Sequence, residues 1–338
     1  MRNVSIAVIF GAVTCSVLAQ SSSPLTLTRT VTLPGVTGKF DHFAIDTANH
    51  KLFVAATGNH SVEVLDLSSG KVSQSITGFG KPHGLAWIPD TGRFYASDGT
   101  QADLKVFNGS PLAKSAHVKL SDDADDMVYD PKTKLLYVGH GGSNAADPAQ
   151  VAVIDTNNQT LIANLPVSTH PEGLDIDKKR DRIFVNIADS AEVAVIDGTK
   201  HAVTATWKLT RAKDNVPLAY DPDRDVLFVA CRTPGRLLAI DGASGKEIAD
   251  LAASGGVDDL FYDSGLRRIY LIAGSGAVDV YEIDATKAVR SLGSTATVKG
   301  AKTGLLVPSL HTLIVGVPGT TEKPAEIRFY ATGMDQTK

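Results

Sequence analysis

Carboxylate and imidazole side chains recur along this chain with a spacing of about 42 to 47 residues or a multiple of it. The set comprises Asp41, His42, His83, Asp125, Asp126, Glu172, Asp258 and Asp259, and Lys302 continues the same spacing. If such side chains converge, each carboxylate raises the pKa of its neighbours unless a cation neutralises the group. Oxygen ligands with one or two histidines suit Ca²⁺, Mg²⁺ or Mn²⁺. The pattern predicts a metal site formed by Asp41, Asp125, Asp126, Asp258 and Asp259, with His42 or His83 as a base.

A simpler interpretation of the same residues stays open. Asp and Gly before a strand are ordinary turn residues, and a solvated channel would accommodate their charges. Turn chemistry explains the two Asp-Asp pairs, at 125–126 and 258–259, least well. The sequence leaves both interpretations open: solvated turns, or a functional site.

Further polar residues are predicted to bind a ligand near the same position. They are Glu172, Arg232, Lys302 and His140. A guanidinium beside a group of acidic side chains can bind the carboxylate of a ligand through two parallel hydrogen bonds, which is the role predicted for Arg232. The alternative, a solvated loop arginine, stays open.

The spacing of these residues follows a repeat of four short β-type segments. In residues 173–208 the segments are GLDID, RIFVNI, VAVID and AVTATWKL, separated by turns rich in Asp, Gly, Ser and Lys. The first segments of the successive copies end at Asp46, Ile88, Asp130, Asp177, Asp221, Asp263 and Val307. Four strands at a period near forty are typical of propeller blades. The sequence therefore predicts an all-β, seven-bladed β-propeller of four-stranded antiparallel blades.

The last copy lacks a fourth strand, and a spare strand lies at the other end of the chain. PLTLTRTVTLPG, residues 24–35, precedes the first copy, whereas the chain ends soon after EIRFYAT, residues 326–332. We predict that the N-terminal strand joins the last blade and closes the ring. The innermost strands then line a central channel. The candidate residues, which lie four and five places before the alignment positions, would form a ring around it.

FVNIADSAEVAVIDGTKHAVTATWKL and FVAATGNHSVEVLDLSSGKVSQSITG resemble the repeat of the bacterial YVTN-family propellers. In that repeat a Tyr-Val-Thr-Asn-like strand precedes a Val-x-Val-Ile-Asp strand and a Gly-Lys turn, although no copy here reads YVTN in full. The resemblance covers essentially the whole chain after its first residues. It implies an architecture similar to the propellers of quinoprotein amine dehydrogenase and of nitrite and nitrous-oxide reductases. It implies a periplasmic or secreted protein and no particular reaction.

The two ends and the composition add further expectations. Arg2 followed by VSIAVIFGAVTCSVLA is typical of a secretory signal peptide over residues 1–19, with residues 20–24 as a flexible mature N-terminus. We expect one propeller domain over residues 25–332, a tail over 333–338, and no membrane insertion after cleavage. The formal net charge of −4 and the lack of a basic block argue against nucleic acid. After cleavage Cys231 is the one remaining cysteine, which excludes an internal disulfide in that product.

Two functions from different classes remain. The first is an exported propeller, expected to be a monomer, that binds an unidentified protein or small molecule through its channel face. The second is a divalent-metal-dependent lyase or lactonase that acts on a sugar acid or lactone, with His42 or His83 as base. The first is preferred because the sequence contains no complete catalytic constellation, and a fold does not imply a function.

Overall fold

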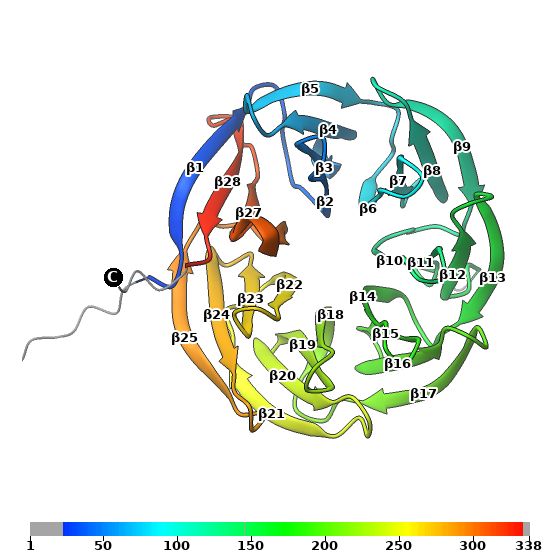
Figure 1. Cartoon of the computed structure of the whole chain (residues 1–338), viewed down its shortest axis with the longest axis vertical. Coiled ribbons are helices and arrows are strands. Elements are labelled where there is room, and N and C mark those ends of the chain that lie inside the picture. The colour runs from blue at the N-terminus through cyan, green and yellow to red at the C-terminus, as the bar shows by residue number, and fades with distance from the viewer. Residues whose placement is uncertain (1–22, 145, 334–338) are drawn as a thin grey trace, which may run out of the picture.

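The structure is a computed structural model, and it describes residues 23–144 and 146–333. Seven four-stranded antiparallel sheets stand around a central axis like the blades of a propeller (Figure 1). The predicted fold class is confirmed. The signal peptide assigned to residues 1–19, with residues 20–22 and 334–338, lies outside the described residues.

Each blade runs from the channel outward through four strands. The innermost strands are β2 (Phe43–Asp46), β6 (Pro82–Ile88), β10 (Met127–Asp130), β14 (Pro171–Asp177), β18 (Lys213–Asp221), β22 (Val257–Asp263) and β26 (Gly304–Val307). The second strands are β3 (Lys51–Ala56), β7 (Arg93–Asp98), β11 (Leu135–His140), β15 (Arg182–Ile187), β19 (Val226–Thr233), β23 (Arg268–Ala273) and β27 (Thr312–Val317).

The two outer positions follow the same order. The third strands are β4 (Ser61–Asp66), β8 (Asp103–Asn108), β12 (Gln150–Asp155), β16 (Glu192–Asp197), β20 (Arg236–Asp241), β24 (Ala277–Ile283) and β28 (Ala325–Ala331). The outermost strands are β5 (Lys71–Ile76), β9 (Ala113–Lys119), β13 (Thr160–Pro166), β17 (Ala202–Lys208), β21 (Glu247–Ala252), β25 (Val289–Ala296) and β1 (Thr26–Leu33). Two 3-10 turns, Thr57–Asn59 and Pro308–Leu310, complete the regular structure of the described residues.

The ring is closed by the N-terminal strand, as predicted. Strand β1 pairs antiparallel with β28, from Thr26 opposite Ala331 to Leu33 opposite Ala325, and so supplies the outer strand of the seventh blade. Figure 1 shows β1 and β28 side by side in this blade. Leu33 is fully buried, whereas Leu27 on the same strand is 48% exposed. The closing strand is therefore held by packing as well as by backbone pairing.

The buried apolar side chains lie between neighbouring blades. Seven hydrophobic clusters occupy the seven interfaces between neighbouring blades. The recurrent aromatic residue of the second strand is buried in every copy: Phe53, Tyr95, Tyr137, Phe184, Phe228 and Tyr270, with Ile314 in the seventh blade. A sheet that is apolar on both faces needs a neighbour on each side, which a closed ring supplies without a capping element.

Aspartates at strand ends fix the turns. Asp66 accepts hydrogen bonds from the backbone N–H and hydroxyl of Ser69, and Asp241 makes the same pair with Ser244. Asp155 and Asp197 likewise accept backbone N–H groups of the turns that follow them. The aspartate at the end of these third strands thus caps the turn that follows.

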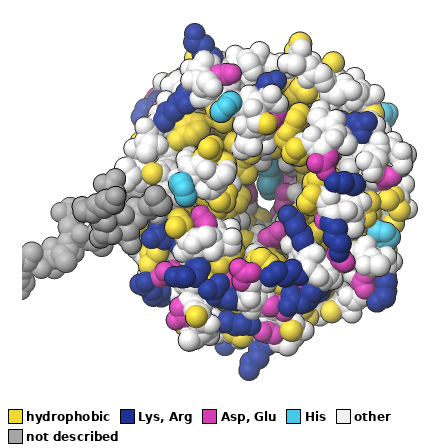
Figure 2. All heavy atoms as spheres, viewed as in Figure 1, with side chains coloured by type: hydrophobic (Ala, Val, Ile, Leu, Met, Phe, Trp, Pro, Cys, Tyr) yellow, Lys and Arg dark blue, Asp and Glu magenta, His cyan; other side chains and the backbone are white. Residues whose placement is uncertain are grey.

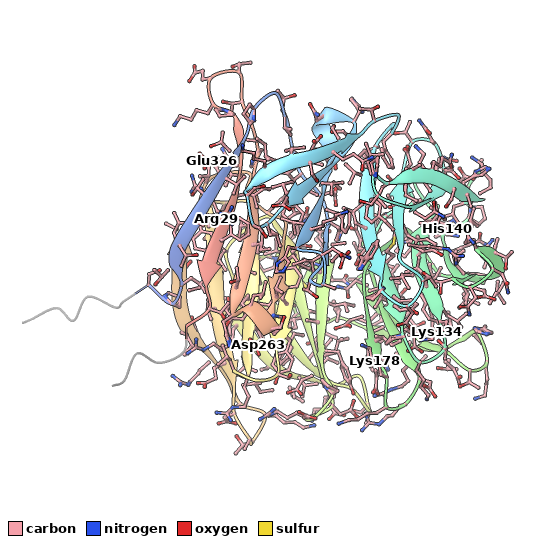
Figure 3. All side chains as sticks on the ribbon, turned by 45° about the horizontal axis from the view of Figure 1, so that its top comes forward. Arg29, Lys134, His140, Lys178, Asp263 and Glu326 are labelled. Carbon is pink, nitrogen blue, oxygen red and sulfur yellow. The ribbon has the colours of Figure 1, made fainter. Side chains whose placement is uncertain are left out.

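The molecule presents two different ends. In Figure 3, His140 and Glu326, which border connections between second and third strands, lie toward one end of the ring. Lys134, Lys178 and Asp263, which lie at connections between first and second strands, are at the other end. No helix among the described residues is both long enough and apolar enough to cross a bilayer.

Candidate functional site

The predicted ring residues sit where each innermost strand begins to pair with its neighbour. In four blades the register shifts at this point: between Pro82 and Leu85, Pro171 and Leu174, Asn215 and Leu218, and Val257 and Asp259. Such a β-bulge leaves one residue unpaired and re-aims its side chain. In this way His83, Glu172, Val216 and Asp258 turn toward the channel.

Glycine beside the ring residue allows neighbouring blades to approach closely. A Cβ atom on Gly84 would lie 2.3 Å from the carbonyl oxygen of Asp125, and one on Gly173 would lie 2.7 Å from that of Val216. A side chain at either position would force the adjacent ring residue outward. The two glycines therefore help to set the radius of the channel.

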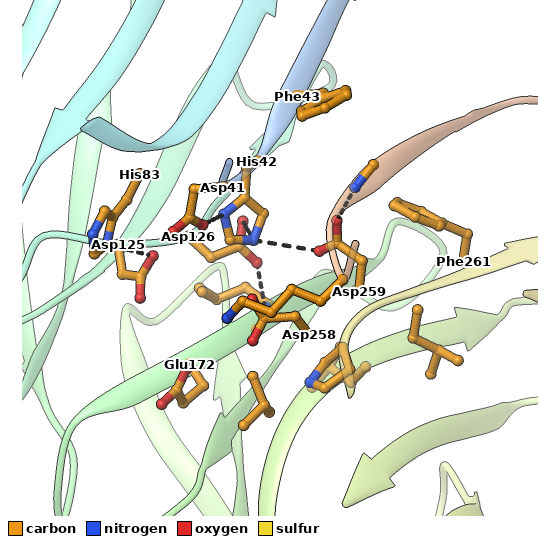
Figure 4. A pocket seen from close by; sticks show the side chains of 18 of the residues that line it. Asp41, His42, Phe43, His83, Asp125, Asp126, Glu172, Asp258, Asp259 and Phe261 are labelled. Carbon is orange, nitrogen blue, oxygen red and sulfur yellow. Dashed lines mark hydrogen bonds and ion pairs between the residues drawn. The ribbon is translucent and has the colours of Figure 1, made fainter. Parts of the chain in front are cut away.

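The ring residues line one cavity of about 480 Å³ in the central channel. Figure 2 shows the opening at the centre of the ring, and Figure 4 shows the cavity from close by. The carboxyl groups that line it are Asp41, Asp123, Asp125, Asp126, Glu172, Asp175, Asp258 and Asp259, against the cationic Lys39, Lys81, Arg232 and Lys302 and the histidines 42, 83 and 170. Carboxyl groups outnumber lysine and arginine two to one, so the cavity favours positively charged or proton-donating groups.

His42 lies among three carboxylates contributed by three blades. Its Nδ1 is 2.8 Å from Asp41 Oδ1, and its Nε2 is 3.5 Å from Asp126 Oδ1 and 3.7 Å from Asp259 Oδ1. Burial opposes the charged imidazolium, but Asp126 and the other two carboxylates outweigh it and raise the pKa of His42 well above its usual value. His42 is therefore a cation near neutral pH and neutralises part of the ring.

The second aspartate of each Asp-Asp pair links neighbouring blades. Asp126 Oδ2 accepts the backbone N–H of Leu174 at 3.1 Å, and Asp259 Oδ2 accepts that of Gly304 at 2.7 Å. Asp175 contacts the next blade in the same way, because its Oδ2 accepts the backbone N–H of Tyr220 at 2.8 Å. Such a contact accounts for the second aspartate of each Asp-Asp pair, because it satisfies a backbone N–H of the adjacent innermost strand.

Burial leaves some of these carboxyl groups with high pKa values. Desolvation dominates and raises the pKa of Glu172 to about 7, that of Asp259 to about 7 and that of Asp175 to about 6. Asp125 differs, because the charge of His83 and contacts with His170 outweigh burial and hold its pKa well below the usual value. The cavity thus holds ionised and protonated carboxyl groups together near neutral pH.

Two cations meet one carboxylate on another side of the cavity. Arg232 pairs with Asp258 Oδ1 and donates from Nε to the carbonyl oxygen of Val257 at 2.8 Å. Lys302 Nζ lies 2.5 Å from Asp258 Oδ2. Asp258 therefore offers one negative charge to two cations. Val216 and Pro217 form an apolar wall beside it.

The structure places every predicted site residue except one around this cavity. The exception is His140, which was expected to contact a ligand. Its Nδ1 accepts the backbone N–H of Ser121 at 3.1 Å, and its Nε2 lies 3.1 Å from Asn164 Oδ1 in the outer strand β13. The ring is 1% exposed and points outward within its own blade, so His140 is a buried structural residue.

Sequence reasoning missed a second tier of polar residues two positions before the ring. These are Lys39, Lys81, Asp123 and His170, all of which line the cavity. His170 matters most, because its Nε2 lies 3.8 Å from Asp125 Oδ2. The same repeat alignment contained the signal: His170-Pro-Glu-Gly occupies the place of Lys81-Pro-His-Gly.

Comparison with known proteins supports the architecture. A segment of 144 residues is 28% identical to the seven-bladed beta-propeller protein Rv1057 of Mycobacterium tuberculosis and covers 42% of this chain and 36% of that protein. The match thus spans about a third of the relative's length. No family model matches the chain.

Solved structures resemble the whole ring at low sequence identity. Hydrazine synthase of Kuenenia stuttgartiensis superposes with a TM-score of 0.72 at 17% identity, over 84% of this chain and 95% of that one. A chain of the mitotic checkpoint complex superposes with a TM-score of 0.75 at 13% identity, over 98% of both chains. At this identity the likeness concerns the fold, and it carries no information about the chemistry of the cavity.

Proposed function

We propose that this propeller is a binding module that holds a small polar molecule in its central channel. The observation that carries the proposal is the single cavity of about 480 Å³ on which ring residues from all seven blades converge. That volume lies within the range of small-molecule sites, roughly 300–1,000 Å³. Charged groups gathered in a concave cavity favour a small ligand over a protein partner, which would need a broad exposed surface.

The charge distribution favours a ligand with a carboxylate at one end. Arg232 and Lys302 share Asp258, which leaves a positive charge for an incoming anion. A guanidinium can bind a carboxylate through two parallel hydrogen bonds. The anionic end of the ligand would lie on this side, with its carbon skeleton against Val216 and Pro217.

The other carboxyl groups of the cavity favour a ligand with several hydroxyl groups. Ionised carboxylates accept hydrogen bonds from hydroxyls, and a carboxyl group with a pKa near 7, such as Glu172, can also donate one. A hydroxylated carboxylate satisfies both sides at once. We therefore propose sugar acids as the ligand class.

The test is calorimetric titration of the protein with glucuronate and gluconate in the presence of EDTA, with neutral glucose as the control ligand. We expect saturable binding of an acid, no measurable binding of glucose, and about tenfold weaker binding by Arg232→Gln, which corresponds to the loss of roughly one charged hydrogen bond. Asp189→Asn, on an exposed loop, is the control variant. Equal affinity for glucose and the acids, or no binding of any acid, would contradict the proposal.

A metal-dependent lyase or lactonase is the second candidate, and the position of His42 favours it. An imidazole that faces Asp41, Asp126 and Asp259 can hold and move a proton at the centre of the cavity. Incubation with uronate oligosaccharides and sugar lactones, with Mn²⁺ added, tests this activity. Turnover that disappears in His42→Gln would support it, and turnover unchanged in that variant would remove His42 from the reaction.

Export and the YVTN relationship belong to the same proposal. The apolar segment after Arg2 supports secretion to the periplasm or beyond, and the repeat FVNIADSAEVAVID supports membership of the YVTN family. Periplasmic fractionation of cells that express the full chain, followed by N-terminal sequencing, tests export. A product that retains Met1 in the cytoplasm would contradict it.

A further inference from the structure

Asp125 lies between two histidines within the cavity. Its Oδ1 is 3.0 Å from His83 Nδ1, and its Oδ2 is 3.8 Å from His170 Nε2. Ligand atoms of Asp125, His170 and Glu172 all lie within 4.8 Å of one another. Ligands around one ion at bond lengths of about 2.0–2.3 Å reach separations of this size.

His170 is held in the manner of a metal ligand. Its Nδ1 donates to the carbonyl oxygen of Gly141 at 2.7 Å, and because a carbonyl only accepts, the proton belongs on Nδ1. The other nitrogen, Nε2, faces Asp125 across 3.8 Å, which is too long for a hydrogen bond. Metal-binding histidines typically donate their second ring N–H to a backbone carbonyl or a carboxylate.

His83 gives a second and independent indication of a bound metal ion. It is 4% exposed, and neither ring nitrogen has a hydrogen-bond partner among the described residues. Its Nδ1 lies 3.0 Å from Asp125 Oδ1, as in an ion pair, but the atoms lack the alignment of a hydrogen bond. Buried polar atoms without hydrogen bonds are costly, and a cation bound by both oxygens of Asp125 would give Oδ1 a partner and would lie beside the His83 ring.

We propose that Asp125, His170 and Glu172 bind one divalent transition-metal ion, with His83 beside the other oxygen of Asp125. Of the ions expected from the sequence, Mn²⁺ suits the two carboxylates, and the imidazole of His170 adds Zn²⁺ as a candidate and makes Ca²⁺ and Mg²⁺ less favourable. The inference deepens the proposed function, on which it rests in one respect: the ion would form part of the site at which the acid binds. Arg232 and Lys302 line the same cavity of about 480 Å³.

The test uses Mn²⁺ alone as the probe. Metal-stripped protein is titrated with MnCl₂ by calorimetry, and pulsed electron paramagnetic resonance of the bound ion records coupling to ¹⁴N of a coordinating imidazole. We expect one ion per chain with ¹⁴N coupling. Glu172→Gln should weaken binding by about tenfold or more, and His170→Gln should remove the coupling. The matched control, Glu322→Gln on an exposed loop, should bind as the unaltered protein does.

Three results would overturn the inference. One is the absence of saturable Mn²⁺ or Zn²⁺ binding at roughly 1 mM, the weak end of protein metal sites. Another is Mn²⁺ bound without ¹⁴N coupling in the unaltered protein, a result that needs no variant to fold. The third is unchanged affinity in both Glu172→Gln and His170→Gln when their circular dichroism spectra match that of the unaltered protein.

The two proposals fail separately. Binding of sugar acids is measured in EDTA, and binding of Mn²⁺ is measured without an acid. Acid binding without metal binding would overturn only this inference, whereas metal binding without acid binding would overturn only the proposed ligand class.

Discussion

Asp259→Asn replaces a buried carboxyl group of the ring by an amide of nearly the same shape. The side chain is 6% exposed, and its Oδ2 accepts the backbone N–H of Gly304 at 2.7 Å. An amide oxygen can accept the same hydrogen bond, so the link between the sixth and seventh blades is retained. The substitution therefore removes the ionisation and little else.

The size of the effect follows from the pKa of Asp259. Burial raises this pKa from 3.8 to about 7, so the unfolded chain loses the proton at a lower pH than the folded protein does. Between these two values the folded state holds more protons, and stability falls as pH rises. One pKa unit corresponds to about 1.4 kcal/mol. Between pH 5 and pH 8 the free energy of unfolding of the unaltered protein therefore falls by about 3 kcal/mol, a loss that the variant does not undergo.

The assay is urea unfolding of both proteins at pH 5 and pH 8. We expect the free energy of unfolding of Asp259→Asn, relative to the unaltered protein, to be about 3 kcal/mol more favourable at pH 8 than at pH 5. Asp189→Asn, which alters an exposed carboxylate, should show the same difference at both pH values. A relative stability of Asp259→Asn that is unchanged between pH 5 and pH 8, or that shifts the other way, would refute the assignment of a high pKa to this group.

Three further outcomes are expected. Leu33→Ala should lower the free energy of unfolding by about 2–5 kcal/mol in urea titrations because Leu33 is fully buried. Leu27→Ala on the same strand should change it by no more than about 0.5 kcal/mol. Equal losses in the two variants would argue against closure of the ring by β1. Cys231, which is 0% exposed and whose pKa burial raises to about 12, should resist Ellman's reagent until urea unfolds the protein; rapid reaction of the native thiol would contradict its burial. His140→Gln should destabilise the protein without weakening Mn²⁺ or acid binding, since its ring contacts Ser121 and Asn164 and not the cavity; a loss of either affinity in a stably folded variant would return it to the site.

The fold could be predicted from the sequence because most copies of the repeat carry the same signals. The buried aromatic residue of the second strand and the terminal aspartate of the third recur often enough to fix both period and register. The seventh copy of the repeat has only three strands, so the extra N-terminal strand was expected to supply the fourth. The pairing of β1 with β28 confirms this expectation.

The candidate site was only partly accessible by the same reasoning. Alignment placed Asp41, Asp125 and Glu172 at one ring position, but it could not reveal the β-bulges that turn ring side chains toward the channel. It also could not reveal that Asp126 and Asp259, which line the cavity, hold a neighbouring blade as well, since that depends on where the next strand lies. His140 was expected to contact a ligand near the ring, but the direction of its side chain is set by hydrogen bonds with Ser121 and with Asn164 in β13.

The pairing of β1 with β28 also dictates an order of events in time. Strand β1 leaves the ribosome well before β28, because about 300 residues separate partners such as Thr28 and Phe329. Strand β1 must therefore wait, unpaired, until β28 has been made. Contacts of such long sequence separation form late and slow folding. Until then the seventh blade lacks its outer strand and the ring cannot close.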